Sequence, residues 1–234
     1  MLDLTRVLAG PTGARTLAEH GADVLKITAA HLPNLGYQEY DTGHGKLSAY
    51  LDLREPKDVE TLRGLVREAD VFSQGYRPGT LAARGFSPET LAGLRPGIVV
   101  VSLCAFGHTG PWASRRGFDT VVQTVSGITQ RQGHLFPGAE PGPQFYPASA
   151  IDYITGYLMA FGAMAALARR AREGGSWLVR ISLAQTGRLI VGRGEVPESR
   201  LANVPKEFSP EEIARWSTTS DTPAGRLRHL APVV

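Results

Sequence analysis

The chain of 234 residues is 42% hydrophobic and 20% charged, an ordinary globular composition with enough apolar residues for a sizeable core. Its formal net charge is only +3, and the basic residues are spread rather than clustered, which argues against nucleic-acid binding and suits a small anionic ligand. No basic and apolar leader opens the sequence, and no uninterrupted apolar run approaches membrane-spanning length, so we expect a cytoplasmic protein without a membrane partner.

Strand-like and helix-like segments alternate between residues 2 and 106. The run LDL precedes the helical segment GARTLAEHG, whose final Gly21 suits a helix C-cap, and the β-like run ADVLKIT follows. The alternation continues through AYLDL, PKDVETLRGLVREA, DVFSQGY, an RPG turn, two short helical pieces and IVVVSLCAF. This pattern predicts an α/β fold, with a Rossmann-like, mostly parallel sheet covered by helices on both faces.

The second half of the chain adds two helices and one strand to this pattern. FDTVVQTVSG and residues 147–170 have helical patterns, and WLVRISLAQ is typical of a further strand. Beyond these, SPEEIARW predicts a short helix, because Ser209 and Glu212 fit a capping box around Pro210. The sequence therefore predicts one domain over residues 1–193 and an irregular tail over residues 194–234 with one short helix.

The sequence lacks the patterns that are typical of disulfides, metal sites and several common enzyme motifs. Cys104 is the single cysteine, so no internal disulfide can form, and its apolar run predicts a small buried side chain. The six histidines show no HxxxH or HxH spacing, so we expect no metal site. Without a GxGxxG fingerprint, a GxxxxGK[ST] loop or a GxSxG elbow, dinucleotide, nucleoside triphosphate and esterase functions have no support.

The long helical segment at 147–170 carries one carboxylate, Asp152, near its start. An Asp there can cap the helix, or it can do chemistry. Asp152 belongs to a stripe of small residues, which continues through Gly156, Ala160, Ala163 and Ala166, while Ile154, Leu158, Phe161 and Ala165 make a bulkier stripe. A carboxylate above a shallow face could meet a ligand or a backbone, and the helix alone leaves both roles open.

Three Gly- and Pro-rich stretches follow predicted strands: TRVLAGP, QGYRPG and AFGHTGPW. Ligands of open parallel sheets bind beyond the carboxyl ends of the strands, where these stretches lie. In the second, Tyr76 and Arg77 could stack on a base and pair with a phosphate, or they could simply form a solvated turn.

Taken in order, these blocks resemble the family III CoA-transferases, also called the CaiB/BaiF group. The resemblance is carried by LDLTRVLAGPTGARTLAEHGADVLKI, GKLSAYLDL, ADVFSQGYRPG, LRPGIVVVSLCAFGHTGPW, GFDTVVQTVSGI and the helix that carries Asp152. It covers roughly residues 2 to 190. It implies an enzyme that moves coenzyme A between an acyl-CoA and a carboxylic acid, on an α/β domain that binds the CoA.

The resemblance places the family's nucleophilic carboxylate at Asp152. A carboxylate can attack a thioester carbonyl and expel CoA thiolate, which makes a mixed anhydride and then an aspartyl thioester. We expect N–H groups at the helix start to keep this carboxylate ionised.

The resemblance also implies where CoA binds. The positions that fall where the family holds the nucleotide and pantetheine are Leu8, Ala9, Leu51, Arg54, Gly75, Tyr76 and Arg77. Ala29 and Ala83 stand where some members have basic residues, and Gly75 stands where an Asn is common.

Length leaves alternatives open. Family members usually continue into a small second domain that closes over the carboxylate, so the resemblance implies a short member without it. Because members form intertwined dimers and the small-residue stripe needs cover, we expect a homodimer, or a hetero-oligomer with a chain that supplies the small domain. A catalytically weak CoA-binding or scaffold subunit is the main alternative. The racemase branch is disfavoured, because Phe118 rather than His precedes Asp119.

Overall fold

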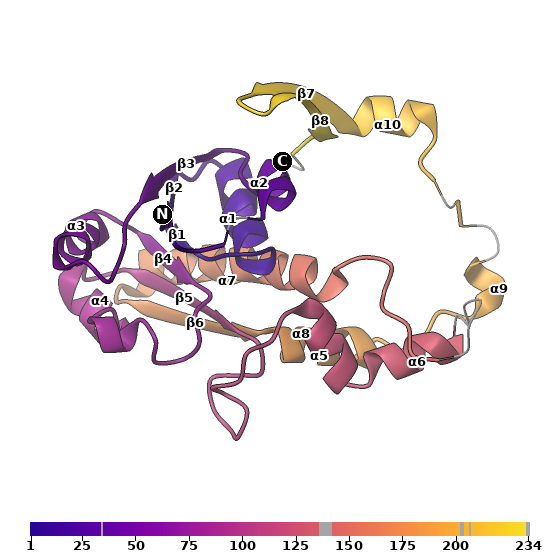
Figure 1. Cartoon of the computed structure of the whole chain (residues 1–234), viewed down its shortest axis with the longest axis horizontal. Coiled ribbons are helices and arrows are strands. Elements are labelled where there is room, and N and C mark those ends of the chain that lie inside the picture. The colour runs from indigo at the N-terminus through magenta and orange to yellow at the C-terminus, as the bar shows by residue number, and fades with distance from the viewer. Residues whose placement is uncertain (34, 136–141, 202–203, 206, 233–234) are drawn as a thin grey trace.

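The computed structural model describes residues 1–33, 35–135, 142–201, 204–205 and 207–232. Its centre is a parallel six-stranded sheet in the order β3-β2-β1-β4-β5-β6 (Figure 1). The strands are β1 (Leu2–Leu4), β2 (Val24–Thr28), β3 (Lys46–Tyr50), β4 (Val71–Gln74), β5 (Val99–Cys104) and β6 (Trp177–Ser182). The order reverses between β1 and β4, which makes the carboxyl ends of these strands the expected ligand site. The predicted Rossmann-like parallel sheet is confirmed.

Helices cover both faces of this sheet and enclose two separate cores. On one face lie α1 (Ala9–Glu19) and α7 (Ala150–Glu173), and on the other α3 (Pro56–Val66) and α4 (Pro88–Leu94). Successive residues of β5 divide between the faces: Val99 and Val101 pack with α7, whereas Val100 packs with α3 and α4. β5 is buried on both faces and is therefore an uninterrupted apolar run until Ser102.

The remaining helices lie around the sheet. They are α2 (Gly36–Thr42), a 3₁₀ turn at Ala82–Arg84, α5 (Asp119–Val125), α6 (Ile128–Leu135) and α8 (Leu183–Gly192). Ser182 caps α8 by accepting a hydrogen bond from the Gln185 N–H at 3.3 Å, so the predicted last strand passes directly into a helix.

The small-residue stripe of α7 is covered by α1 of the same chain. A Cβ at Gly156 would lie 2.6 Å from the Ala9 carbonyl oxygen, and one at Gly13 would lie 2.8 Å from the Gly156 carbonyl oxygen. The expectation that this stripe needs a second subunit is therefore wrong, because the α1 backbone fills it. The bulky side of α7 is the open one: Phe161 is 67% and Tyr157 49% exposed.

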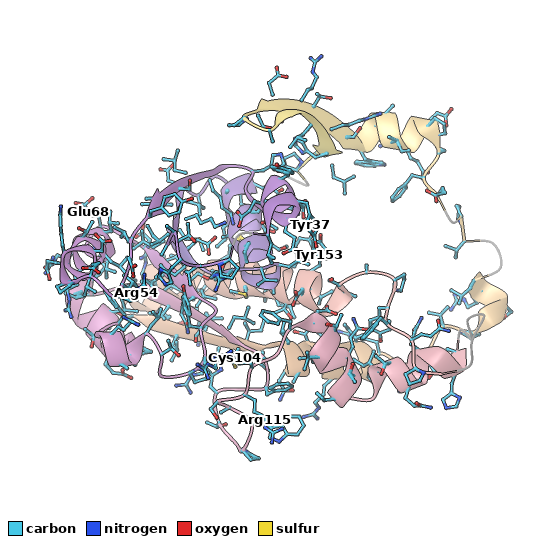
Figure 2. All side chains as sticks on the ribbon, in the orientation of Figure 1. Tyr37, Arg54, Glu68, Cys104, Arg115 and Tyr153 are labelled. Carbon is cyan, nitrogen blue, oxygen red and sulfur yellow. The ribbon has the colours of Figure 1, made fainter. Side chains whose placement is uncertain are left out.

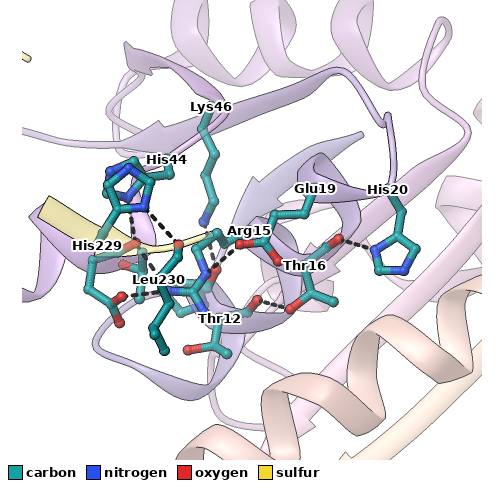
Figure 3. Close-up of polar contacts among 12 residues, drawn as sticks. Thr12, Arg15, Thr16, Glu19, His20, His44, Lys46, His229 and Leu230 are labelled. Carbon is teal, nitrogen blue, oxygen red and sulfur yellow. Dashed lines mark hydrogen bonds and ion pairs between the residues drawn. The ribbon is translucent and has the colours of Figure 1, made fainter. Parts of the chain in front are cut away.

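A buried ion pair joins β1, β3 and α1. Lys46 donates hydrogen bonds from Nζ to Oδ2 of Asp3 at 3.0 Å and to the Pro11 carbonyl oxygen at 2.8 Å (Figure 3). The other oxygen of Asp3 accepts the N–H of Thr5 at 3.0 Å and its hydroxyl at 2.5 Å. Strand β1 and the first turn of α1 are thereby held to one carboxylate.

The tail differs from the irregular segment that the sequence predicts. The capping-box helix is present as α10 (Pro210–Trp216), but α9 (Glu198–Leu201) and an antiparallel hairpin of β7 (Ser217–Thr222) and β8 (Gly225–Leu230) accompany it. The hairpin escapes prediction because its strands are mostly polar and lack apolar alternation. Its His229 ring lies 4.1 Å from that of His44, which follows α2 (Figure 3).

By length and composition, α7 is the one helix in the described part of the chain that could cross a membrane. Here its small face is buried against α1 and the sheet, as in the core helix of a globular domain.

The contact between α1 and α7 predicts a specific loss of stability. Gly156→Ala should lower the free energy of unfolding by roughly 1–3 kcal/mol, because the added methyl group meets backbone that cannot move aside easily. Gly64→Ala in α3 is the matched control: a Cβ there meets nothing within 4 Å, so only the helix propensity gain of up to about 1 kcal/mol applies. Denaturant unfolding measures both. Equal stabilisation by the two substitutions would contradict the close contact.

Candidate active site

Asp152 lies in the first turn of α7, and only 5% of it is exposed. Its own backbone N–H donates a hydrogen bond to Oδ2 of Asp119 at 3.0 Å. Within the described residues, no group donates a hydrogen bond to the Asp152 carboxylate. Asp152 is therefore not the cap of its helix. The cap comes from α5, and the Asp152 side chain is left without a structural partner.

Asp119 belongs to a buried chain of hydrogen bonds that sequence reasoning missed. The Gln123 amide nitrogen donates to Oδ1 of Asp119, and the Gln123 amide oxygen accepts the Tyr146 N–H at 2.9 Å. Asp119 is 4% exposed and Gln123 1%. The segment that leads into α7 and the first turn of α7 are both tied to α5. Only the four-residue spacing of Asp119 and Gln123 could have suggested part of this network.

The surroundings of Asp152 change its protonation. Burial, and next the negative charge of Asp119, raise the pKa of Asp152 to about 7. This corrects the expectation that N–H groups at the helix start keep the group ionised, because the backbone N–H of Asp152 is committed to Asp119. Near neutral pH, both the carboxylic acid and a poorly solvated, basic carboxylate are therefore populated.

The first turn of α7 is also held from the side of α1 and α2. The Tyr153 hydroxyl donates to Oδ2 of Asp41 at 3.2 Å, and Arg15 donates to Oδ1 of the same carboxylate at 2.5 Å. Arg15 also pairs with Glu19 at 3.3 Å (Figure 3). The turn that carries Asp152 is therefore hydrogen bonded to α5 through Asp119 and to α2 through Tyr153.

The turn between β1 and α1 is strained. Val7 has a φ of +70°, a left-handed conformation that is costly for a β-branched residue. The hydrogen bonds of Thr5 to Asp3 hold the chain just before it, and Leu8 and Ala9, just after it, are buried. Gly75 lies on the adjacent strand end, where an added Cβ would be 3.9 Å from the Thr5 Cβ. Predicted CoA positions thus meet where the strand order reverses.

Three of the predicted CoA residues line one cleft of about 170 Å³ on the α3 side of the sheet: Leu51, Arg54 and Tyr76. Arg54 is already engaged, because it donates from Nε and Nη2 to Asp52 at 2.5–3.0 Å and holds the pKa of that carboxyl well below its usual range. Figure 2 places Arg54 near α3 and Tyr153, the neighbour of Asp152, near α2. Asp152 does not line this cleft, and neither do Leu8 and Ala9.

Arg77 does not accompany Tyr76. Tyr76 faces the first cleft, and burial raises the pKa of its phenol, whereas Arg77 lines a separate cleft with His108 and Arg180. The sequence hypothesis of one aromatic and one guanidinium acting on the same nucleotide stays a prediction, and it requires a ligand that spans both clefts. As for metals, the residues that the structure describes hold no group of three or more His, Cys, Asp or Glu suited to binding one.

Comparisons with known proteins agree on one family. A sequence model of CoA-transferase family III matches residues 1–207. Acetyl-CoA:oxalate CoA-transferase of Acetobacter aceti is 34% identical, over 99% of this chain and 58% of the relative. Human succinyl-CoA:glutarate CoA-transferase is 33% identical, over 74% of this chain and 42% of the relative.

Solved structures give the same result. A CAIB/BAIF family protein from Brucella suis matches with a TM-score of 0.72 and 28% identity, over 96% of this chain and 63% of that one. Rv3272 from Mycobacterium tuberculosis also has a TM-score of 0.72, with 29% identity, over 82% of this chain and 58% of that one. In every one of these matches the chain spans less than two thirds of the other protein.

The contact between Asp119 and Asp152 predicts a shift in titration. In Asp119→Asn, the amide oxygen can still accept the Asp152 N–H, but the negative charge is gone. Because a like charge disfavours ionisation, its removal should lower the pKa of Asp152 from about 7, although burial, the larger cause, will keep it above the ordinary value. Carboxyl ¹³C NMR titration, assigned with Asp152→Asn, measures this. Asp221→Asn in the exposed hairpin should leave the titration unchanged, and an unshifted pKa in Asp119→Asn would contradict the coupling.

Proposed function

The chain belongs to CoA-transferase family III, and from this premise we propose that it transfers CoA from an acyl-CoA thioester to a carboxylic acid with Asp152 as the nucleophile. The observation that carries the proposal is that the Asp152 carboxyl group is buried and accepts no hydrogen bond from any residue that the structure describes. A buried carboxylate without a structural partner is unusual, because burial of an ionised group is costly. Such groups are concentrated at sites of chemistry.

The proposed reaction has four steps. The Asp152 carboxylate attacks the thioester carbonyl, the C–S bond breaks, and CoA leaves as thiolate, which gives a mixed anhydride. The thiolate then attacks the aspartyl carbonyl, so that the first acid departs and an aspartyl-CoA thioester remains. The acceptor carboxylate attacks this thioester, the C–S bond breaks, and CoA leaves again as thiolate, which gives a second anhydride. CoA thiolate finally attacks the acceptor's carbonyl, which releases the new acyl-CoA and regenerates the Asp152 carboxylate.

The proposed roles of the neighbours follow from their contacts. Asp119 accepts the Asp152 N–H and so fixes the backbone that carries the nucleophile. Its charge and the burial of the site keep the Asp152 carboxylate poorly stabilised, and a poorly stabilised carboxylate is a stronger nucleophile. The fraction of Asp152 that is ionised should limit the rate below a pH of about 7.

The clefts suggest a path for coenzyme A. We propose that the nucleotide occupies the cleft of Leu51, Arg54 and Tyr76, and that pantetheine crosses the point between β1 and β4, along the backbone of Leu8, Ala9 and Gly75. This route leads from the α3 side of the sheet to the α7 side, where Asp152 lies. CoA is the only cofactor-like group in this proposal, as a substrate, and no step needs a metal.

The names of the relatives suggest which acids to test first. They pair acetyl-CoA with oxalate and succinyl-CoA with glutarate, so short dicarboxylates are the first acceptors to try. A racemase activity has less support, since Phe118 stands where that branch carries a histidine and is 56% exposed.

A subunit role is the second candidate. A relative from Chloroflexus aurantiacus is named as the alpha subunit of a succinyl-CoA–L-malate CoA-transferase, and the chain spans 45% of it. The exposed Tyr157 and Phe161 of α7 offer an apolar surface to another chain. We therefore propose a dimer or a larger assembly, and sedimentation of a monomer at micromolar concentration would argue against it.

Kinetics of two variants on the same helix test the nucleophile. Asp152→Asn should lower turnover by about a thousandfold or more, because the amide cannot form the anhydride. Glu173→Gln, at the exposed far end of α7, should leave turnover within about twofold. Acyl-CoA consumption with oxalate, glutarate and succinate measures both. Turnover by Asp152→Asn at the unaltered rate would refute the assignment, and no turnover by the unaltered chain with any acid would favour the subunit role.

A further inference from the structure

A third cleft, of about 160 Å³, is lined by side chains from along β4, β5 and β6. Its apolar wall includes Phe72, Phe86 and Val100, which belong to the core under α3 and α4. It therefore lies on the face of the sheet opposite α7 and Asp152. Its polar lining consists of Gln74, Arg77, Ser102, His108 and Arg180.

The floor of this cleft is a fixed polar array. Gln74 donates from Nε2 to the Ser102 hydroxyl at 2.5 Å, and Nε2 of His108 lies 3.0 Å from the same oxygen. Nδ1 of His108 is 3.5 Å from Sγ of Cys104, at the carboxyl end of β5 (Figure 2). These contacts fix His108 in the wall of the cleft, beside the two arginines.

The charges distinguish this cleft from two other clefts of the chain. In the cleft of Leu51 and Tyr76, Arg54 pairs with Asp52, and Arg84 donates to the Leu53 carbonyl oxygen. A further cleft of about 290 Å³ has every cation partnered in the same way: Lys26 with Glu39, Lys46 with Asp3, and Arg6 with the Pro33 carbonyl oxygen.

Arg77 and Arg180 differ from these cations. Over the described parts of the chain, neither has an ion pair or a side-chain hydrogen bond, and no Asp or Glu lines their cleft. Glu89 of α4 feels the charge of Arg180 but is held by its own helix start and lies outside the cleft. Burial and then Arg180 lower the pKa of His108, as expected where positive charge is not compensated.

We propose that this cleft binds a small oxyanion, a phosphate or a carboxylate, between Arg77 and Arg180, with the Ser102 hydroxyl as a further donor. Guanidinium groups form strong, charge-assisted and often bidentate hydrogen bonds with both kinds of anion. The site is separate from the Asp152 site and does not require transferase activity. The anion is either a free metabolite or a phosphate of bound CoA that reaches over from the adjoining cleft.

Calorimetry on the full chain with inorganic phosphate and with malonate tests the site. At least one of the two should bind saturably, and Arg77→Gln and Arg180→Gln should each weaken binding about tenfold or more, the loss of a charge-assisted hydrogen bond. Arg188→Gln is the matched control, since Arg188 of α8 is exposed and lines none of these clefts. Asp152→Asn should bind like the unaltered chain, which separates this site from the proposed catalysis.

A second readout follows His108 directly. Because a bound anion offsets the positive charge of the cleft, it should raise the pKa of His108 in an imidazole ¹⁵N titration. CoA that displaces the probe would identify a CoA phosphate as the natural occupant, and binding of both together would identify a free anion. Absence of saturable binding, or equal binding by the Arg77 and Arg180 variants, would overturn the proposal.

Discussion

The buried carboxylate of Asp3 is the interaction on which the candidate site depends. It receives Lys46 from β3 and both the N–H and the hydroxyl of Thr5, and Lys46 reaches on to the Pro11 carbonyl oxygen of α1. Burial lowers the pKa of Lys46, which Asp3 opposes, so the two charges need each other. Removing one partner of such a pair typically costs about 3–5 kcal/mol, because the other is left buried and unpaired. The pair fixes both ends of the turn in which Val7 is strained, and thereby the start of α1. Where α1 starts determines how its backbone meets Gly156 of α7, one turn after Asp152.

Asp3 and Asp152 are both buried, yet their surroundings give them opposite properties. Asp3 accepts hydrogen bonds from three donors, one of which is the cationic Lys46, so it is a structural anion. Asp152 has no donor in the described chain and a second carboxylate beside it, and its pKa is raised to about 7. Two carboxyl groups whose environments differ in this way take different roles. The same reasoning separates the clefts, because the cations of two are held by carboxylates or carbonyl oxygens of the chain, while Arg77 and Arg180 of the third are exposed.

Sequence reasoning predicted the parallel sheet, the helix of Asp152 and the α10 capping box, because each is encoded within a short segment. It failed where distant segments meet. The hydrogen bond from the Asp152 N–H to Asp119 joins residues that are 33 positions apart in the sequence. The spacing of residues within either helix does not indicate it. The small stripe of α7 was correctly read as a close-contact face, but its partner is α1 rather than a second chain. Tyr76 and Arg77 are neighbours in sequence that line different clefts, because the chain bends at Tyr76, just after β4.

The central claim is that acyl transfer passes through a covalent bond to Asp152, and chemical trapping tests it most directly. The chain is incubated with an acyl-CoA, treated with hydroxylamine and digested, and the peptides are weighed. An anhydride or thioester at Asp152 reacts to give a hydroxamate, whereas an ordinary carboxylate does not. The account predicts a hydroxamate on the peptide that contains Asp152, dependent on acyl-CoA. Turnover without any label on that peptide would contradict it.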